Sequence, residues 1–251
     1  GPLRKHAGAK RTEGKKMKQT SANPAQRKKG RKTARLQEVL FSLGIISSIL
    51  YLITDIAASL MWREYSPVSQ TVSELIAIDA PTRVYVAVSF ILYALLIYAY
   101  GAGILLSSGG KRALKIAACL IIAKELLGLA ATLFFPIHLR GIPADFSDKL
   151  HGILTAAGVF LCMFPAMIAG AVSFKGKFRA CSVITMILFV VFGLLAGLEQ
   201  PKYALNLPTP LMGVWERINI YGYMLWIVIF SALLLKSSKV NKPSKGLSKR
   251  Q

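Results

Sequence analysis

The sequence predicts an all-α membrane protein, a polytopic bundle of six transmembrane helices. Of its 251 residues, 54% are hydrophobic and 17% are charged, whereas soluble domains carry about 25% charged residues. The net charge of +21 is distributed unevenly, because residues 1–35 hold 13 Lys or Arg and a single acid. Long apolar runs dominate the rest of the chain, which excludes a soluble enzyme that merely carries a basic tail.

Six apolar runs are long enough to cross a membrane, since a helical span needs about 20 predominantly apolar residues. The second and fourth runs contain no Asp, Glu, Lys or Arg. The sixth is the shortest, but the Trp and Tyr residues near its start are typical of helices held at the membrane surface. The predicted spans are Val39–Trp62, Val84–Leu106, Ala113–Pro136, His151–Phe174, Cys181–Pro201 and Ile218–Leu235.

Lys and Arg are strongly biased to one side of these spans. The two terminal segments and the second and fourth connections hold 25 of the 32, whereas the first, third and fifth connections hold six. Such residues favour the cytoplasmic side of a membrane. We therefore expect a plasma-membrane protein with both termini in the cytoplasm and with connections 63–83, 137–150 and 202–217 outside.

The membrane domain is expected over 36–236, between two basic cytoplasmic tails, 1–35 and 237–251. The first tail has no apolar periodicity and is predicted to be disordered. Its basic cluster either signals topology only or also binds anionic lipid of the inner leaflet, at about 1 kcal/mol per residue. Nucleic-acid binding is not expected, because no aromatic residue is interleaved to stack on bases. The cluster consists of Arg27, Lys28, Lys29, Arg31 and Lys32.

The first outer connection is predicted to form a short amphipathic helix. Ser66 is a good N-cap for a helix that begins at Pro67. Ser69 and Ser73 would then share a face with Ser66, and Glu74 lies beside them. One interpretation is an interfacial helix without chemistry. The other is that Ser73 and Glu74 point into a polar pocket between the helices.

Several ionisable residues lie within the predicted spans, where charge is costly and often functional. Lys124 and Glu125 are sequence neighbours at mid-depth, so each is expected to need a partner on another helix, and Asp55 is the candidate for Lys124. An ion-paired network that only fixes helix packing is the alternative. The residues expected to line one outward-facing cavity are Asp55, Glu125, Glu199, Arg217 and Asn219, with Glu216 at the start of the sixth span.

The third connection leads to a carboxylate–imidazole pair. Asp148 and His151 are three residues apart, so on a helix the carboxylate would orient the ring for general-base work. With Asp145 the pair could also bind a divalent cation, or Asp148 could simply cap the helix. A three-histidine zinc site is impossible in the membrane domain, because it contains only His138 and His151. No metal is therefore predicted.

Four segments together give the chain a family resemblance. They are YSPVSQTVSELIAIDAPTR after the first span, FFP at the end of the third, Asp-x-x-His before the fourth, and GVWERINIYGYMLWIVIF at the sixth. Over roughly residues 40–236 the chain resembles the bacterial and archaeal membrane family "domain of unknown function 998". By similarity, the characteristic polar positions of that family are Ser73, Glu74, His151, Glu216 and Arg217. The resemblance implies a membrane fold and no activity.

Two functional hypotheses follow, and the sequence leaves open whether the protein is an enzyme. The first is that an outward-facing polar pocket binds or moves a lipid-like or small amphiphilic ligand, or that the protein supports a membrane complex with a protein partner. The alternative is an intramembrane hydrolase or transferase acting on a lipid, with His151, Asp148 and Ser73 as catalytic candidates. No cofactor motif is present. The candidate ligand-binding residues are Asp55, Ser69, Ser73, Glu74, Glu125, His151, Glu216 and Arg217.

Overall fold

The computed structural model describes residues 24–240, and this range is helical without strands. Six helical stretches are long and apolar enough to cross a membrane, which confirms the predicted six-span all-α fold. In chain order the helical segments of 24–240 are α1 (Pro24–Met61), the 3-10 helix η1 (Val72–Ile76), α2 (Arg83–Ser107), α3 (Arg112–Phe134), α4 (Phe146–Ala157), the π-helical segment η2 (Gly158–Met163), α5 (Phe164–Ser173), α6 (Lys177–Ala204) and α7 (Met212–Val240).

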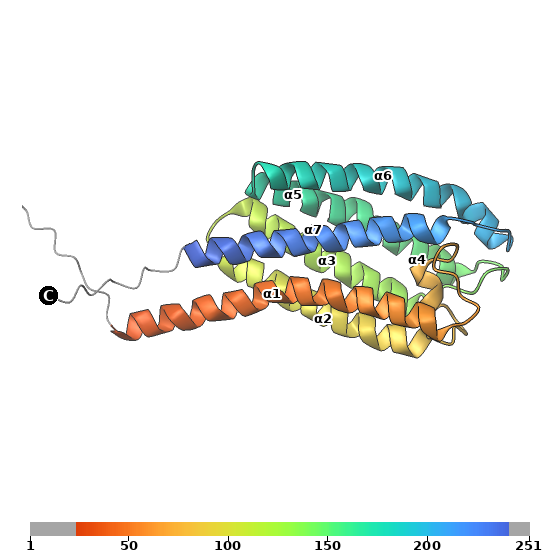
Figure 1. Cartoon of the computed structure of the whole chain (residues 1–251), viewed down its shortest axis with the longest axis horizontal. Coiled ribbons are helices and arrows are strands. Elements are labelled where there is room, and N and C mark those ends of the chain that lie inside the picture. The colour runs from red at the N-terminus through yellow and green to blue at the C-terminus, as the bar shows by residue number, and fades with distance from the viewer. Residues whose placement is uncertain (1–23, 241–251) are drawn as a thin grey trace, which may run out of the picture.

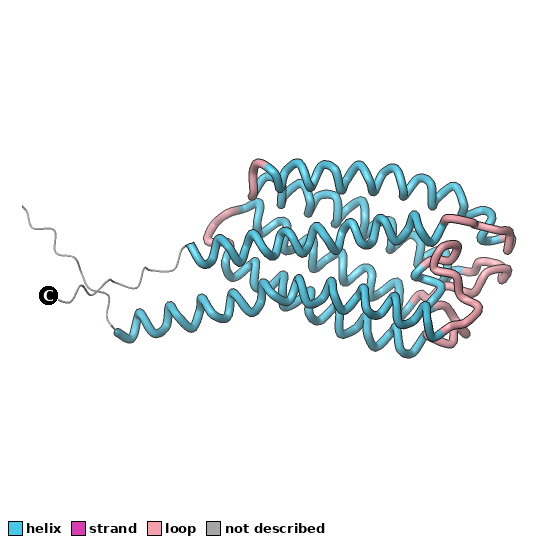
Figure 2. The backbone as a smooth tube through the Cα atoms, viewed as in Figure 1, coloured by secondary structure: helices cyan, strands magenta, loops and turns pink. Residues whose placement is uncertain are grey.

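The spans form a ring in which each one packs against the next (Figure 1). The fourth span consists of α4, η2 and α5, and it packs on α6 through α5. The ring closes because α7 packs against α1 as well as α6. We call the end of the bundle that carries the long connections 62–82, 135–145 and 205–211 the loop end, and the opposite end the terminal end (Figure 2).

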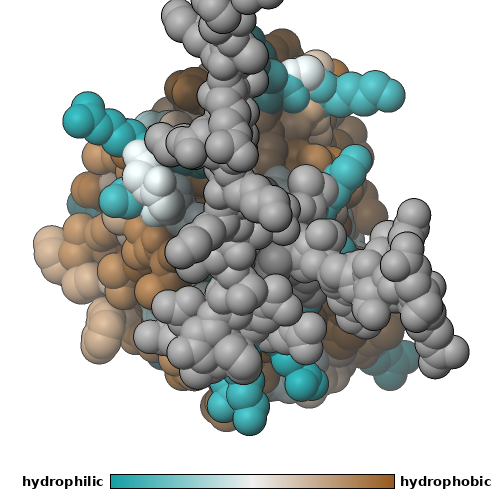
Figure 3. Space-filling model, turned by 90° about the vertical axis from the view of Figure 1, so that its left-hand side faces the viewer, coloured by the Kyte–Doolittle hydropathy of each residue, from teal (hydrophilic) through white to brown (hydrophobic). Residues whose placement is uncertain are grey.

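Positively charged side chains gather at the terminal end. The view onto this end shows hydrophilic side chains projecting beyond hydrophobic flanks (Figure 3). Lys111, Arg112, Lys175 and Lys177 are exposed in the two short connections there. Apolar residues are exposed along the flanks, which is the pattern expected where lipid replaces water.

Several helix boundaries differ from those predicted, and α4 and α7 begin earlier than expected, at Phe146 and Met212. α1 already begins at Pro24, so residues 24–35, expected to be disordered, are helical. Lys, Arg, Gln and Ala are strong helix formers, and here they extend a helix that is stable in the span. The predicted helix from Pro67 is wrong, because residues 67–70 form turns and the 3-10 helix begins only after its N-cap Thr71. α6 continues through Pro201 to Ala204 instead of ending there.

The fourth span contains one wide helical turn, η2. The amide N–H of Phe164 donates to the carbonyl of Val159, five residues earlier, instead of four. A π-turn adds one residue to the helix and is frequent at functional sites. It separates α4, which carries His151, from α5, whose Met167 lies in the main core.

Two apolar cores hold the bundle together. The larger one lies between the spans and includes the aromatic cluster of Phe178, Trp226 and Phe230, whose ring centroids are 5.0–5.6 Å apart. The indole N–H of Trp226 donates to Ser182 Oγ at 2.9 Å, which satisfies its polar atom. The smaller core includes Leu75 of η1, so η1 packs into the loop end of the bundle.

Candidate functional site

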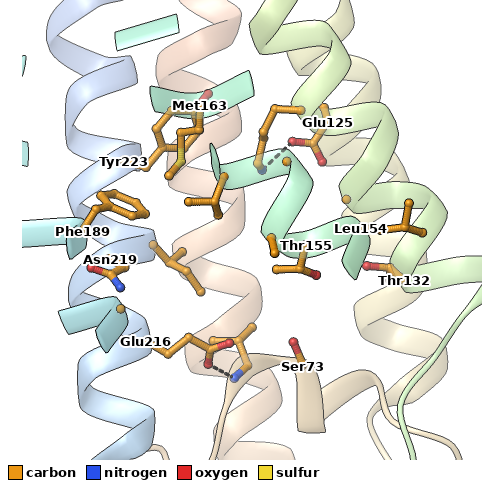
Figure 4. Close-up of a pocket in the computed structure, with 18 of the residues that line it drawn as sticks. Ser73, Glu125, Thr132, Leu154, Thr155, Met163, Phe189, Glu216, Asn219 and Tyr223 are labelled. Atoms are coloured by element: carbon orange, nitrogen blue, oxygen red, sulfur yellow. Dashed lines mark hydrogen bonds and ion pairs between the residues drawn. The ribbon is translucent and has the colours of Figure 1, made fainter. Parts of the chain in front are cut away.

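A cavity of about 480 Å³ lies within the bundle and reaches from the loop end to mid-depth. Its walls come from η1, α3, α4, η2, α6 and α7, with contributions from α1 and α2. Figure 4 shows Ser73 and Glu216 at one end of the cavity and Glu125 and Met163 at the other. Apolar side chains such as Leu154 and Phe189 lie between these ends. Asn219, Thr132 and Thr155 lie at the same level, so the cavity has carboxyl groups at both ends and a middle lined by both apolar and polar side chains.

The side of the cavity between the fourth and fifth spans borders the lipid-facing surface. Thr155 and Phe160 line the cavity and are also exposed, Phe160 by 66%. On α6, Val190 and Leu194 likewise line the cavity, with 49% and 65% exposure. Residues on both sides of this gap therefore face the cavity and the membrane at once.

Lys124 and Glu125 form an ion pair at the mid-depth end of the cavity. Lys124 Nζ lies 3.1 Å from Glu125 Oε2, and it also lies over the rings of Tyr93 and Tyr223, at 6.0 and 5.5 Å from their centroids. The prediction that Lys124 pairs with Asp55 is wrong. Adjacent helical residues diverge at Cβ, but the long lysine side chain bends back to the neighbouring carboxylate, where the tyrosine faces also attract its charge.

His151 lines the cavity, but its predicted partner does not orient it. Its Nδ1 lies 3.1 Å from the carbonyl oxygen of Ala131 and 2.9 Å from that of Phe135. Carbonyl oxygens only accept, so Nδ1 carries a proton and donates it to these carbonyls. The predicted Asp148–His151 pair is wrong, because Asp148 is bound by the loop that precedes α4.

Asp148 belongs to a structure that we call the loop clasp, formed by His138, Asp145 and Asp148. The two carboxylate oxygens of Asp148 accept hydrogen bonds from the backbone N–H and from Nδ1–H of His138, each at 2.8 Å. Asp145 and Asp148 also cap the start of α4 reciprocally. The hydrogen bond that its imidazole donates to the Asp148 carboxylate raises the pKa of His138 above its ordinary value. These oxygens are already used by N–H donors, so the cluster has a structural explanation that needs no cation.

A second group of contacts ties all three long connections together. Arg140 Nε lies 2.6 Å from Glu74 Oε1, and its Nη2 lies 2.9 Å from Glu74 Oε2. The same guanidinium donates to the carbonyl of Ser69 and to Thr209 Oγ1, at 2.9 and 2.8 Å. This pairing raises the pKa of Arg140. Glu74 and Ser69 were expected to bind a ligand. They bind Arg140 instead, because the buried Glu74 carboxylate faces Arg140 and not the cavity.

Arg217 and Asp55 form a buried ion pair next to the first connection. Arg217 Nε and Nη2 lie 2.9 and 2.8 Å from the two oxygens of Asp55, which is 2% exposed. Arg217 Nη1 donates to the carbonyls of Pro67 and Gln70, and Nη2 donates to the Tyr65 hydroxyl. The Tyr221 hydroxyl is a further donor to Asp55. Every donor direction of the guanidinium is thus used within the protein.

The expected site residues therefore separate into two groups. Ser73, Glu125, His151 and Glu216 line the cavity, as does Asn219. Asp55, Ser69, Glu74 and Arg217 hold the loop end instead, and Glu199 pairs with Lys202 at 3.0 Å. Sequence reasoning missed Arg140 as a structural residue, since nothing in its own segment indicates a partner 66 positions away. The residues that line the cavity from the expected set are Ser73, Glu125, His151, Glu216 and Asn219.

Two of the four segments that carried the family resemblance, the first and the last, meet at the cavity. The backbone N–H of Val72, next to Ser73, donates to Glu216 Oε2 at 2.5 Å, and Val214 N–H donates to the carbonyl of Val68. Residues 45–233 match a family model described as "Protein of unknown function (DUF998)". The chain belongs to this family. No curated protein and no solved structure matches it.

In this DUF998 protein the matched region covers the second to fifth spans, most of the first and sixth spans, and the loops between them. It therefore contains the cavity, the loop clasp and both buried Arg–carboxylate contacts. Taken with the six apolar helices, membership makes the chain a multi-pass membrane protein of the DUF998 family.

Proposed function

We propose that the cavity binds, and in binding shelters or moves, a lipid-like amphiphile that is taken from the membrane. The observation that carries this proposal is the gap between the fourth and fifth spans. Phe160 and Leu194 line the cavity there and are exposed on the flank that faces lipid. An apolar chain can pass between them without leaving an apolar environment, while its head group reaches the polar loop end.

The chemistry of the lining agrees with such a ligand. Leu154, Val159 and Phe189 supply apolar surface along the middle of the cavity. Ser73 and Glu216 supply hydrogen-bonding groups at its loop end. A polar solute would make no apolar contacts with Leu154, Val159 and Phe189. A hydrocarbon would leave Ser73 and Glu216 without hydrogen-bond partners from the ligand, which costs binding free energy.

The proposal is tested by native mass spectrometry of protein extracted gently into a nonionic detergent. We expect a co-purified amphiphile on the wild-type protein. Thr155→Trp should lower its occupancy, because the indole would fill the gap. Ile153→Trp is the matched control, since Ile153 is exposed on the same helix but does not line the cavity. Equal occupancy in both variants, or none in the wild type, would refute the proposal.

We propose further that the loop end faces the exterior and the terminal end the cytoplasm of a plasma-membrane protein. The support is the excess of Lys and Arg at the terminal end. Lys28 and Lys32 are exposed one turn apart on α1. Together with Arg27, Lys29 and Arg31 they would attract anionic lipid of the inner leaflet. Liposome flotation with and without phosphatidylserine tests this attraction.

A further inference from the structure

Glu216 lacks a cationic partner among residues 24–240, unlike five other carboxylates of the spans and connections. Its Oε2 accepts the backbone N–H of Val72. The neighbouring Arg217 is directed away, toward Asp55 and the loop carbonyls. The acids with a basic partner are Asp55 with Arg217, Glu74 with Arg140, Glu125 with Lys124, Asp148 with His138 and Glu199 with Lys202.

This difference leaves a carboxyl group without a cation at the loop end of the cavity. At mid-depth Lys124 is compensated by Glu125, so these two contribute no net charge. Glu216 lines the loop end, where Val72, Ile76 and Ile220 supply apolar surface. A carboxylate in such surroundings is stabilised by a cation that replaces its lost hydration. The protein supplies that cation for every other carboxylate of the set, but not here.

We propose that the amphiphile carries a protonated amine in its head group and that Glu216 binds this amine. This inference rests on the proposed function and names the class of its ligand. The ammonium lies at the loop end, within reach of Glu216 and the Ser73 hydroxyl, and the apolar chain follows the cavity toward the gap beside Phe160. A head group that is only anionic is disfavoured, because it would meet the carboxylate.

The test compares three probes with the same twelve-carbon chain: dodecylamine, dodecanol and dodecanoate. Each is added to protein from which bound lipid has been removed in a nonionic detergent, and bound probe is counted by native mass spectrometry. We expect the wild type to bind the amine at least about tenfold more tightly than the alcohol. Glu216→Gln should abolish this preference while the amide oxygen still accepts from Val72. Because both proteins are measured in the same micelles, partitioning of each probe cancels.

Glu199→Gln is the control, since Glu199 is paired with Lys202 and does not line the cavity. It should keep the preference for the amine. Equal binding of the three probes to the wild type would overturn the amine assignment and leave the proposed function standing. Binding of none of them, with no co-purified lipid, would refute both. If Glu216→Gln fails to fold, the wild-type ratio of amine to alcohol binding, corrected for the measured micelle partitioning of each probe, tests the assignment instead.

Discussion

The Arg217–Asp55 contact provides the strongest test of how the loop end is held. Replacing Arg217 by Met removes the charge and the donors but keeps most of the side-chain volume. Asp55, which is 2% exposed, is then left as a buried carboxylate whose one remaining side-chain donor within residues 24–240 is the Tyr221 hydroxyl. The carbonyls of Pro67 and Gln70 lose a donor as well.

The expected cost follows from these losses. Breaking a buried ion pair by removing one partner costs about 3–5 kcal/mol. The double variant Asp55→Leu with Arg217→Met removes the unpaired charge and should recover part of this. It cannot recover everything, because the Pro67 carbonyl loses its donor, which costs about 1–3 kcal/mol, whereas the Gln70 carbonyl still accepts from the Tyr65 hydroxyl. We therefore expect Arg217→Met to be less stable than the double variant, and both to be less stable than the wild type.

The assay is unfolding in mixed micelles by SDS titration, followed by tryptophan fluorescence. Lys202→Met is the matched control, because the Lys202 side chain is 47% exposed and its pair with Glu199 is expected to contribute at most about 1 kcal/mol. If Arg217→Met lost no more stability than Lys202→Met, the guanidinium would not hold the first connection, and the reasoning would be refuted.

Three further predictions concern the loop end. Because the pKa of His138 is raised in the folded protein, the loop clasp should stabilise the fold fully below about pH 6.5. This stabilisation should disappear as the pH rises through the folded-state pKa. A His138→Gln variant should therefore show a flatter pH profile of thermal stability. Gly213→Ala should destabilise by about 1–3 kcal/mol, because a Cβ would meet two carbonyl oxygens of the first connection, whereas Gly152→Ala has open space and should be neutral in the same melts. In intact cells of a cysteine-free background, Ile142→Cys should react with an impermeant maleimide and Lys239→Cys should not; the reverse pattern would invert the proposed orientation.

The spans could be predicted because apolar length is a property of one continuous segment. Partners could not be, as Lys124 and Asp148 show. Sequence spacing identifies neighbours on the same helix, so it favoured Asp148 with His151, although the preceding loop folds back and brings His138 to Asp148. Asp55 was correctly singled out as costly, but its partner depended on the depth and rotation of α7, which no local pattern encodes.

The cavity was foreseen only in outline, for the same reason. Glu125, His151 and Glu216 come from three different spans, and their polarity alone suggested that they meet. Glu74 has equal polarity, yet Arg140 draws it into the loop contacts. The deciding residue lies in a connection whose path cannot be deduced from apolar periodicity.

The wide turn of the fourth span fixes the angular phase between its two halves. One additional residue rotates everything that follows by about 100° relative to an uninterrupted α-helix. α4 can therefore direct His151 inward while α5 directs Met167 into the main core. Loss of one residue from Gly158–Met163 would convert the wide turn into a regular α-helical turn and keep the two halves in phase. Gain of one residue would instead turn the inward face of one half toward lipid, so within this stretch relatives should tolerate the loss of one residue better than the gain of one.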